Sequence, residues 1–301
     1  MSDTLPRPIG RSRSSDRAGV GPLRRRGARW FSVMLVVLAV LVLLNSALGP
    51  LALDLVDYPI SASVANQLVG LELVSVLLVV PVCLTAGVLA WHGHPGGPPL
   101  AFGPAAYVAY MFAQYVLGPE YDAYTGAVVL HLALFALGLG LAVWAWALSV
   151  DTVPPVPESR RRAWALVLFL LAAFVLSRYA GGLLGAATQT PIPEEFAAER
   201  TFYWSIVLLD LGIVLPATVA AGVAVLRGSP LGAPALYAVV GWYALVPPSV
   251  AAMGAVMLAR DDPYASATQV VLLSVVAVLF AAFAVVVFRP LLAGRAGVEA
   301  G

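Results

Sequence analysis

The sequence of 301 residues contains no lysine, one cysteine and three histidines. Without lysine, the chain cannot form the Schiff base through which retinal or pyridoxal phosphate is bound. Because Cys83 is alone, an intrachain disulfide, a CxxC redox pair and a thiolate-bound cluster are excluded. Only His131 falls within a long apolar run, which excludes ligation of a haem by two helical histidines.

Metal and nucleotide motifs are missing as well. His92 and His94 stand close together, but no carboxylate or cysteine is near them in the sequence to complete a metal site. No Walker, GxSxG, HExxH or GxGxxG pattern stands in a suitable context. We therefore expect no cofactor, no metal and no nucleic-acid partner.

Charge is scarce and apolar residues dominate. The chain is 61% hydrophobic and 11% charged, with a mean hydropathy of +0.91, which is typical of a protein whose partner is the lipid bilayer. A helix needs roughly 20 mostly apolar residues to cross about 30 Å of hydrocarbon. Eight stretches meet this requirement: 30–51, 64–91, 100–117, 126–150, 163–183, 202–226, 234–258 and 267–288.

The second half of the chain repeats the first. Four of the predicted spans fall in each copy, so both copies enter the membrane from the same side. We therefore predict an all-α membrane protein whose eight transmembrane helices form a tandem 4+4 parallel repeat. The matching features are Arg24–Arg26 with Arg160–Arg162, Trp30 with Trp164, Pro81 with Pro216, Gly87 with Gly222 and Tyr107 with Tyr237.

The arginines predict the orientation. They concentrate in the two tails and in the loops after the fourth and sixth spans, which places both termini in the cytoplasm by the positive-inside rule. The expected location is the plasma (inner) membrane. The N-terminal tail, rich in Arg, Ser, Gly and Pro, is predicted to be disordered. The segments are the tail 1–29, the first repeat 30–150, the linker 151–163, the second repeat 164–288 and the tail 289–301.

Polar side chains within the spans gather toward the outer ends. Glu72, His131 and Asp210 lie about two helical turns below those ends, and the inner halves are almost wholly apolar. An ionisable group inside a membrane costs about 2.5–3.5 kcal/mol to insert and by default faces the bundle interior or a water-filled cavity. We therefore predict a polar cluster for ligand binding or ion pairing, made of Asn45, Glu72, Gln114, His131, Arg178 and Asp210.

Within this cluster, Arg178 and Asp210 lie at similar depth on consecutive antiparallel spans, so an ion pair between them is expected to be available. Glu72 would then share that arginine, or His131, with Asp210. The pattern predicts that Glu72 takes up a proton or binds a cation. The structural alternative is that these contacts only join the helices.

The seventh span is interrupted. Pro247 and Pro248 fall near its middle, where they remove two backbone donors. Such a break either borders a binding cavity or is tolerated as an ordinary kink. The connection 185–200 is the longest outer loop and is a candidate lid over the polar cluster.

One passage carries a resemblance. The stretch from Leu209 through Gly212, Pro216 and Gly222 to Gly241 resembles passages in uncharacterised multi-pass integral membrane proteins of actinobacteria. The exclusive use of arginine, with abundant alanine and glycine, is typical of a GC-rich bacterial genome. The resemblance implies the broad class, and it implies no substrate, catalytic residue or cofactor.

Three functions fit these features. The first is binding or sensing of a small molecule or cation in an outward-facing polar pocket. The second is a secondary transporter, proton-coupled through Glu72 or Asp210, against which the apolar inner halves weigh. The third is a membrane enzyme acting on a lipid or quinone, with His131 and a carboxylate as acid and base. A lone helical histidine is more often a core residue than a catalyst, so binding or sensing ranks first.

Overall fold

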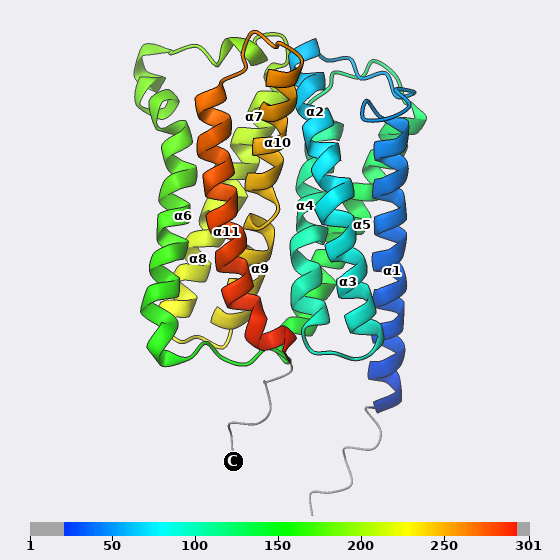
Figure 1. Cartoon of the computed structure of the whole chain (residues 1–301), viewed down its shortest axis with the longest axis vertical. Helices are drawn as coiled ribbons and strands as arrows, with labels where there is room; N and C mark the ends of the chain where they lie inside the picture. The colour runs from blue at the N-terminus through cyan, green and yellow to red at the C-terminus, as the bar shows by residue number, and fades with distance from the viewer. Residues whose placement is uncertain (1–20, 294–301) are drawn as a thin grey trace, which may run out of the picture.

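The computed structural model of this chain describes residues 21–293, and within that range the chain is helical with no strand. Eight stretches are long and apolar enough to cross a membrane, as the sequence predicts (Figure 1). We number them as spans 1 to 8. They are α1 (Gly21–Leu48); α2 (Ala62–Val74), η1 (Ser75–Val79) and α3 (Val80–Trp91); α4 (Gly97–Leu117); α5 (Gly126–Val150); α6 (Glu158–Leu184); α7 (Arg200–Leu209), η4 (Asp210–Val214) and α8 (Leu215–Leu226); α9 (Gly232–Tyr243) and α10 (Val246–Ala259); and α11 (Ala267–Leu292).

The first and last helices extend beyond the predicted spans. α1 begins at Gly21 and has Pro22 in its first turn, where the missing N–H of a proline is tolerated. Residues 21–29, predicted to belong to the disordered tail, are therefore helical, and the rest of that tail lies outside the described residues. α11 runs to Leu292, whereas its predicted end is residue 288.

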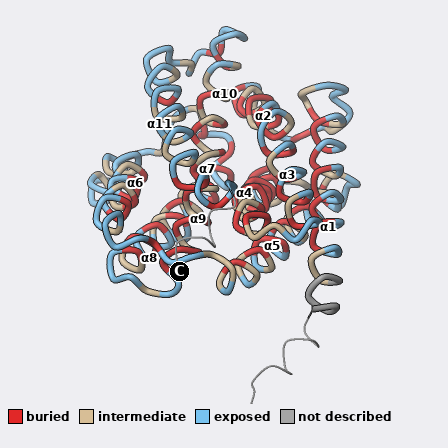
Figure 2. Tube along the Cα trace, turned by 60° about the horizontal axis from the view of Figure 1, so that its bottom comes forward, coloured by how far each residue is buried: buried red, intermediate tan, exposed pale blue. Residues whose placement is uncertain are grey.

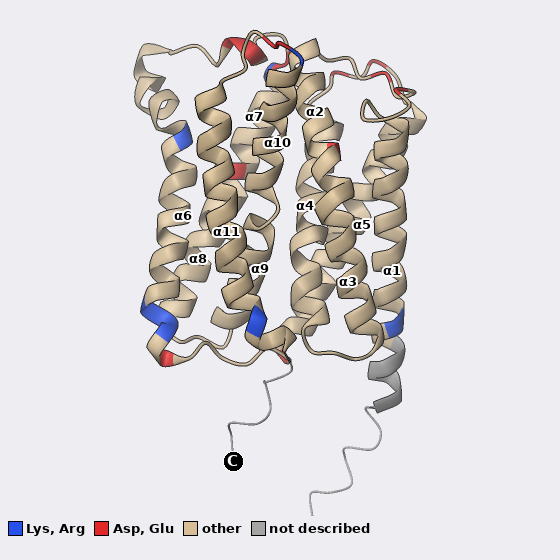
Figure 3. Cartoon of the chain, in the orientation of Figure 1, with Lys and Arg blue, Asp and Glu red and all other residues tan. Residues whose placement is uncertain are grey.

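Both ends of the described chain lie at one end of the bundle, which we call the terminal end; the opposite one is the far end (Figure 1). Basic residues mark the terminal end and acidic residues gather at the far end, with few charges between them (Figure 3). Three helices begin at the far end with a side-chain cap, because a hydroxyl accepts a hydrogen bond from the first helical turn. These caps are Ser61 for α2, Thr125 for α5 and Ser266 for α11.

Spans 2 and 6 carry the same irregularity. In each, a five-residue π-helical segment, η1 or η4, comes just before the helix that has Pro81 or Pro216 in its first turn. A proline lacks the N–H for the helical ladder and its ring obstructs the preceding turn. The wider π turn accommodates this defect, and such turns are frequent at functional sites. Asp210 is the first residue of η4 and Ser75 is the first residue of η1.

Span 7 is divided into two helices. α9 ends at Tyr243 and α10 begins at Val246, with Pro247 and Pro248 in its first turn. These prolines cannot donate to the carbonyls of Tyr243 and Ala244, so the helical ladder is interrupted at this point. The break that the sequence predicts at the two prolines thus lies just before them.

The helices pack in the same pattern in both halves. α1 packs against α3 and α6 against α8, while α4 packs against α5 and α10 against α11. The halves meet through α2 against α10, α7 against α4 and α4 against α9. Span 1 departs from this pattern: α1 also packs against α5 and α4, whereas α6 is not packed against α11, α9 or α10 among the packed pairs of the described chain.

The core is centred on α4, which is largely buried in the middle of the bundle (Figure 2). Glycine allows α4 to approach α9 closely. A Cβ atom added at Gly103 would come within 2.6 Å of the backbone of Gly241. By contrast, a Cβ added at Gly140 on α5 meets no atom within 4 Å.

These two glycines provide a test of the packing between the halves. Gly103→Ala should lower thermal stability by about 1–3 kcal/mol, because the extra methyl group overpacks a helix crossing. Gly140→Ala should leave stability unchanged or raise it, since alanine favours the helix. Thermal unfolding of both variants in detergent, followed by circular dichroism, measures the difference. Equal stability of the two variants would contradict the close approach of α4 and α9.

Candidate functional site

The polar residues of the first half form a closed cluster, the Glu72 cluster, made of Asn45, Tyr58, Glu72 and His131. Glu72 is fully buried. Its Oε1 accepts a hydrogen bond from Asn45 Nδ2 at 3.3 Å, and its Oε2 accepts one from the backbone N–H of Leu51 at 3.2 Å. The cluster therefore joins α1, α2 and the loop between them through the two oxygens of one carboxyl group.

His131 completes this cluster from α5. Its Nε2 lies 3.0 Å from Asn45 Oδ1 and 3.3 Å from the Tyr58 hydroxyl. Because an amide oxygen only accepts hydrogen bonds, Nε2 donates to Asn45 Oδ1, while Nδ1 is buried without a hydrogen-bond partner in the described chain. The Tyr58 ring stacks on the imidazole with 5.7 Å between centroids, and Tyr115 meets it edge-on at 5.3 Å. The His131 side chain is thus held on all sides by protein groups.

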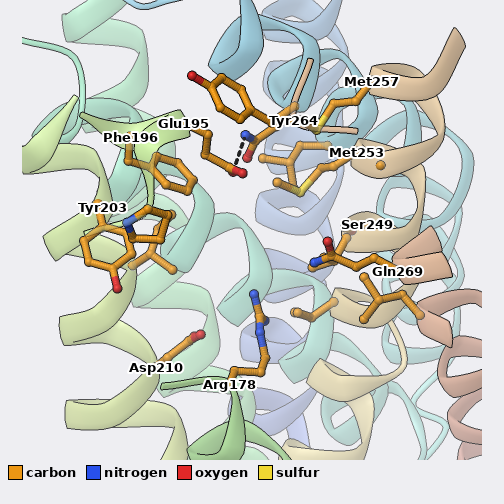
Figure 4. Close-up of a pocket in the computed structure, with 18 of the residues that line it drawn as sticks. Arg178, Glu195, Phe196, Tyr203, Asp210, Ser249, Met253, Met257, Tyr264 and Gln269 are labelled. Carbon is orange, nitrogen blue, oxygen red and sulfur yellow. Dashed lines mark hydrogen bonds between the residues drawn. The ribbon is translucent and has the colours of Figure 1, made fainter. Parts of the chain in front are cut away.

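The polar residues of the second half line an open cavity of about 460 Å³. The cavity lies among α2, α4, α6, α7, η4, α10 and α11, toward the far end (Figure 4). Its walls combine apolar side chains and methionines with a few polar groups. The polar and charged residues of the lining include Gln67, Gln114, Arg178, Glu195, Asp210, Ser249 and Gln269.

The carboxylate of Asp210 is bound by two tyrosines. The hydroxyl of Tyr110 on α4 donates to Oδ1 at 2.6 Å, and that of Tyr179 on α6 donates to Oδ2 at 2.5 Å. Arg178 is not among the partners of this carboxylate, so the ion pair expected between Arg178 and Asp210 is replaced by tyrosine hydrogen bonds. Both carboxyl oxygens of Asp210 are thus bound by tyrosine hydroxyls.

Arg178 points into the cavity (Figure 4). Its guanidinium carbon lies 6.0 Å from the centre of the Tyr179 ring, which is the distance of a cation–π contact. The residue is exposed, and none of the hydrogen bonds or ion pairs in the described chain involves it. The guanidinium thus presents its donors to the space of the cavity.

Two connections cover the cavity at the far end, and both are tied to α2. Glu195 on η3 (Glu194–Phe196) accepts a hydrogen bond from Gln67 Nε2 at 3.1 Å (Figure 4). Burial raises the pKa of the Glu195 carboxyl, and the bond from Gln67 opposes that shift. Asp262, in the connection before α11, accepts from Asn66 at 2.9 Å. Part of the candidate lid 185–200 therefore lies over the cavity and is held in place.

The six residues predicted to form one cluster thus fall into two groups. Asn45, Glu72 and His131 belong to the closed cluster, whereas Gln114, Arg178 and Asp210 line the cavity. His131 serves neither acid as a counter-ion. The sequence analysis missed Tyr110 and Tyr179 as partners of Asp210. The signal for them was that Tyr179 directly follows Arg178 and that Tyr110 lies one helical turn before Gln114.

The two groups have a common design. In each half, a side chain of the first span donates to an acid of the second span: Asn45 to Glu72 and Tyr179 to Asp210. In the first half the fourth span closes over this pair, because His131 on α5 contacts Asn45. In the second half the fourth span, α11, stands apart from α6, and the cavity occupies that position.

Comparison with family models, with curated proteins and with solved structures found no match to this chain. The resemblance to actinobacterial membrane proteins therefore rests on the quoted passage alone.

The partners of Asp210 can be tested by double-mutant cycles. Tyr179→Phe should lower thermal stability by about 1–3 kcal/mol, because it removes a donor from a buried carboxylate. Its effect should be strongly non-additive with that of Asp210→Asn. Arg178→Ala should instead be additive with Asp210→Asn. Thermal unfolding measures both couplings. If Asp210 is coupled to Arg178 and not to Tyr179, the ion pair exists and the assignment of Tyr179 as the partner of Asp210 is wrong.

Proposed function

We propose that this protein binds or senses a small ligand in the cavity of its second half, from the outer side of the plasma membrane. The observation that carries the proposal is the cavity itself. Six of the eight spans line it, and it combines apolar walls with a few convergent polar groups, as ligand sites do. The fixed carboxylate of Asp210 and the guanidinium of Arg178 give such a ligand an orientation.

The charge distribution supports the orientation. Arginine side chains mark the terminal end, in the first turns of α6 and at the ends of α8 and α11, while acids gather at the far end (Figure 3). By the positive-inside rule the terminal end is cytoplasmic and the far end is external. The cavity then opens in the outer half of the bilayer.

The tandem 4+4 repeat is part of the proposal. It is supported by the π segments that precede Pro81 and Pro216, by the matching packing of spans 1 to 4 and 5 to 8, and by the two pairs Asn45–Glu72 and Tyr179–Asp210. In this interpretation the two halves were once equivalent. The first half fills its central space with its own side chains, and the second keeps that space for a ligand.

Transport is the second candidate. The π turn at Asp210 and the divided span 7 both border the cavity, through Asp210 itself and through Val246 and Ser249. Discontinuous helices at a binding site are typical of secondary transporters. A membrane enzyme is less well supported, because His131 lies in the Glu72 cluster and does not line the cavity.

The orientation can be measured by thiol labelling. In a Cys83→Ala background, Thr190→Cys at the far end should react with a membrane-impermeant maleimide applied to intact cells. His92→Cys at the terminal end should react only after the cells are opened. Both positions are exposed, whereas the native Cys83 is buried. The reverse pattern of labelling would invert the topology.

The binding function can be tested by filling the cavity. Gln269 lines the cavity on α11 and is exposed, whereas Val271, close by on the same helix, does not line it and is 64% exposed. We expect a small molecule to co-purify with the wild type and with Val271→Trp. Gln269→Trp should retain about tenfold less of it, because the indole occupies the site. Mass spectrometry of the denatured proteins compares the three.

Identical extracts from all three proteins would refute ligand binding in the cavity. Thermal unfolding serves as the control for folding, since both tryptophan variants alter only exposed positions.

A further inference from the structure

α6 and α11 stand on either side of one part of the cavity. Both helices line the cavity, yet they are not a packed pair in the described chain. Arg178 on α6 and Gln269 on α11 both face the cavity and are both exposed. In the first half, the equivalent helices α1 and α5 close against each other. The second half therefore has a side entrance in the place where the first half has a sealed contact.

This entrance lies at the depth of the surrounding lipid. α11 and α6 are apolar membrane spans with most of their surface exposed outside the bundle. The cavity wall includes the apolar side chains of Val270 and Leu273 on α11 and of Ile206 on α7. A molecule that enters here comes from the bilayer, so its larger part is apolar.

The charged groups that line the cavity determine which polar head group the molecule carries. Asp210 already accepts two hydroxyl donors, and Glu195 accepts a donor from Gln67. Arg178 has no acid partner in the described chain, and its guanidinium remains charged under all ordinary conditions. A charge at membrane depth requires a counter-charge or water. A phosphate or carboxylate matches the planar donors of arginine best, since it accepts two parallel hydrogen bonds.

We propose that the ligand is an anionic lipid of the surrounding leaflet, which enters between α6 and α11 with its acidic head group on Arg178 and its acyl chain along α11. This inference rests on the proposed function, because it names the ligand class of the same cavity. Tyr179 assists by placing the guanidinium, over whose charge its ring lies. Gln269, on the opposite side of the entrance, offers a neutral donor to the same head group.

The test uses the full chain purified in a neutral detergent and titrated with phosphatidylglycerol or phosphatidylcholine of equal chain length. Native mass spectrometry counts the lipids that remain bound. We expect phosphatidylglycerol to bind the wild type about tenfold more tightly than phosphatidylcholine does, which is the effect of a charge-assisted contact. Arg178→Gln should lose this preference, and Arg178→Lys should retain part of it.

Two further variants control for folding and for non-specific attraction. Arg200 is an exposed arginine at the same end of the bundle, and it does not line the cavity. The Arg200→Gln variant should therefore bind phosphatidylglycerol as the wild type does. Gln269→Glu keeps an exposed, polar position but adds a negative charge at the entrance. It should weaken phosphatidylglycerol binding as Arg178→Gln does.

The outcomes separate this inference from the proposed function. If Gln269→Trp loses its co-purified molecule but Arg178→Gln keeps the preference for phosphatidylglycerol, the cavity binds a ligand and the assignment to an anionic lipid is overturned. If glycerol phosphate at equal concentration displaces phosphatidylglycerol fully, the ligand is a soluble anion and the side entrance is not used. Loss of preference in Arg178→Gln alone, with no displacement, supports the proposal.

Discussion

The arrangement of this protein depends on the free-energy cost of placing polar groups where water is absent. Each acid within the spans has its oxygens occupied by donors from neighbouring helices: Asn45 and a backbone N–H for Glu72, and two tyrosines for Asp210. Because such contacts have few competitors in hydrocarbon, they determine which helices lie together. Arg178 is the exception, and it lines the cavity of about 460 Å³.

The comparison of the two halves shows how one packing scheme gives two results. The first half places aromatic rings around His131 and closes α1 on α5. The second half has an arginine and a tyrosine in the corresponding part of α6, and α11 stands away from it. A bulky charged side chain cannot be packed into an apolar interface without a partner. The difference between a sealed contact and a cavity therefore follows from a few residues on one helix.

The fold was largely predictable from the sequence, and the site was predictable only in part. Hydropathy locates all eight spans because the bilayer imposes their length. The residues Gln114, Arg178 and Asp210 were found because charges and amides in a span are rare. Their division from the Glu72 cluster could not be predicted, because depth along a helix says nothing about which neighbour a side chain faces. Tyr110 and Tyr179 could not be identified as partners of Asp210 for a similar reason, since a tyrosine in a span is compatible with packing in the core as well as with a polar site.

The divided span 7 has a mechanical consequence. α10 carries Ser249 and Met253 on the cavity, and its backbone at Met253 touches Gly70 of α2 so closely that no Cβ fits between them. The prolines at its start release it from the hydrogen-bond ladder of α9. We expect α10 to move as a rigid body relative to α9. A molecule that displaces α10 outward would displace α2 together with α10. The first half of the chain would thus register an occupant through the packing of α10 on α2, in addition to the direct lining by Gln67 and Leu71.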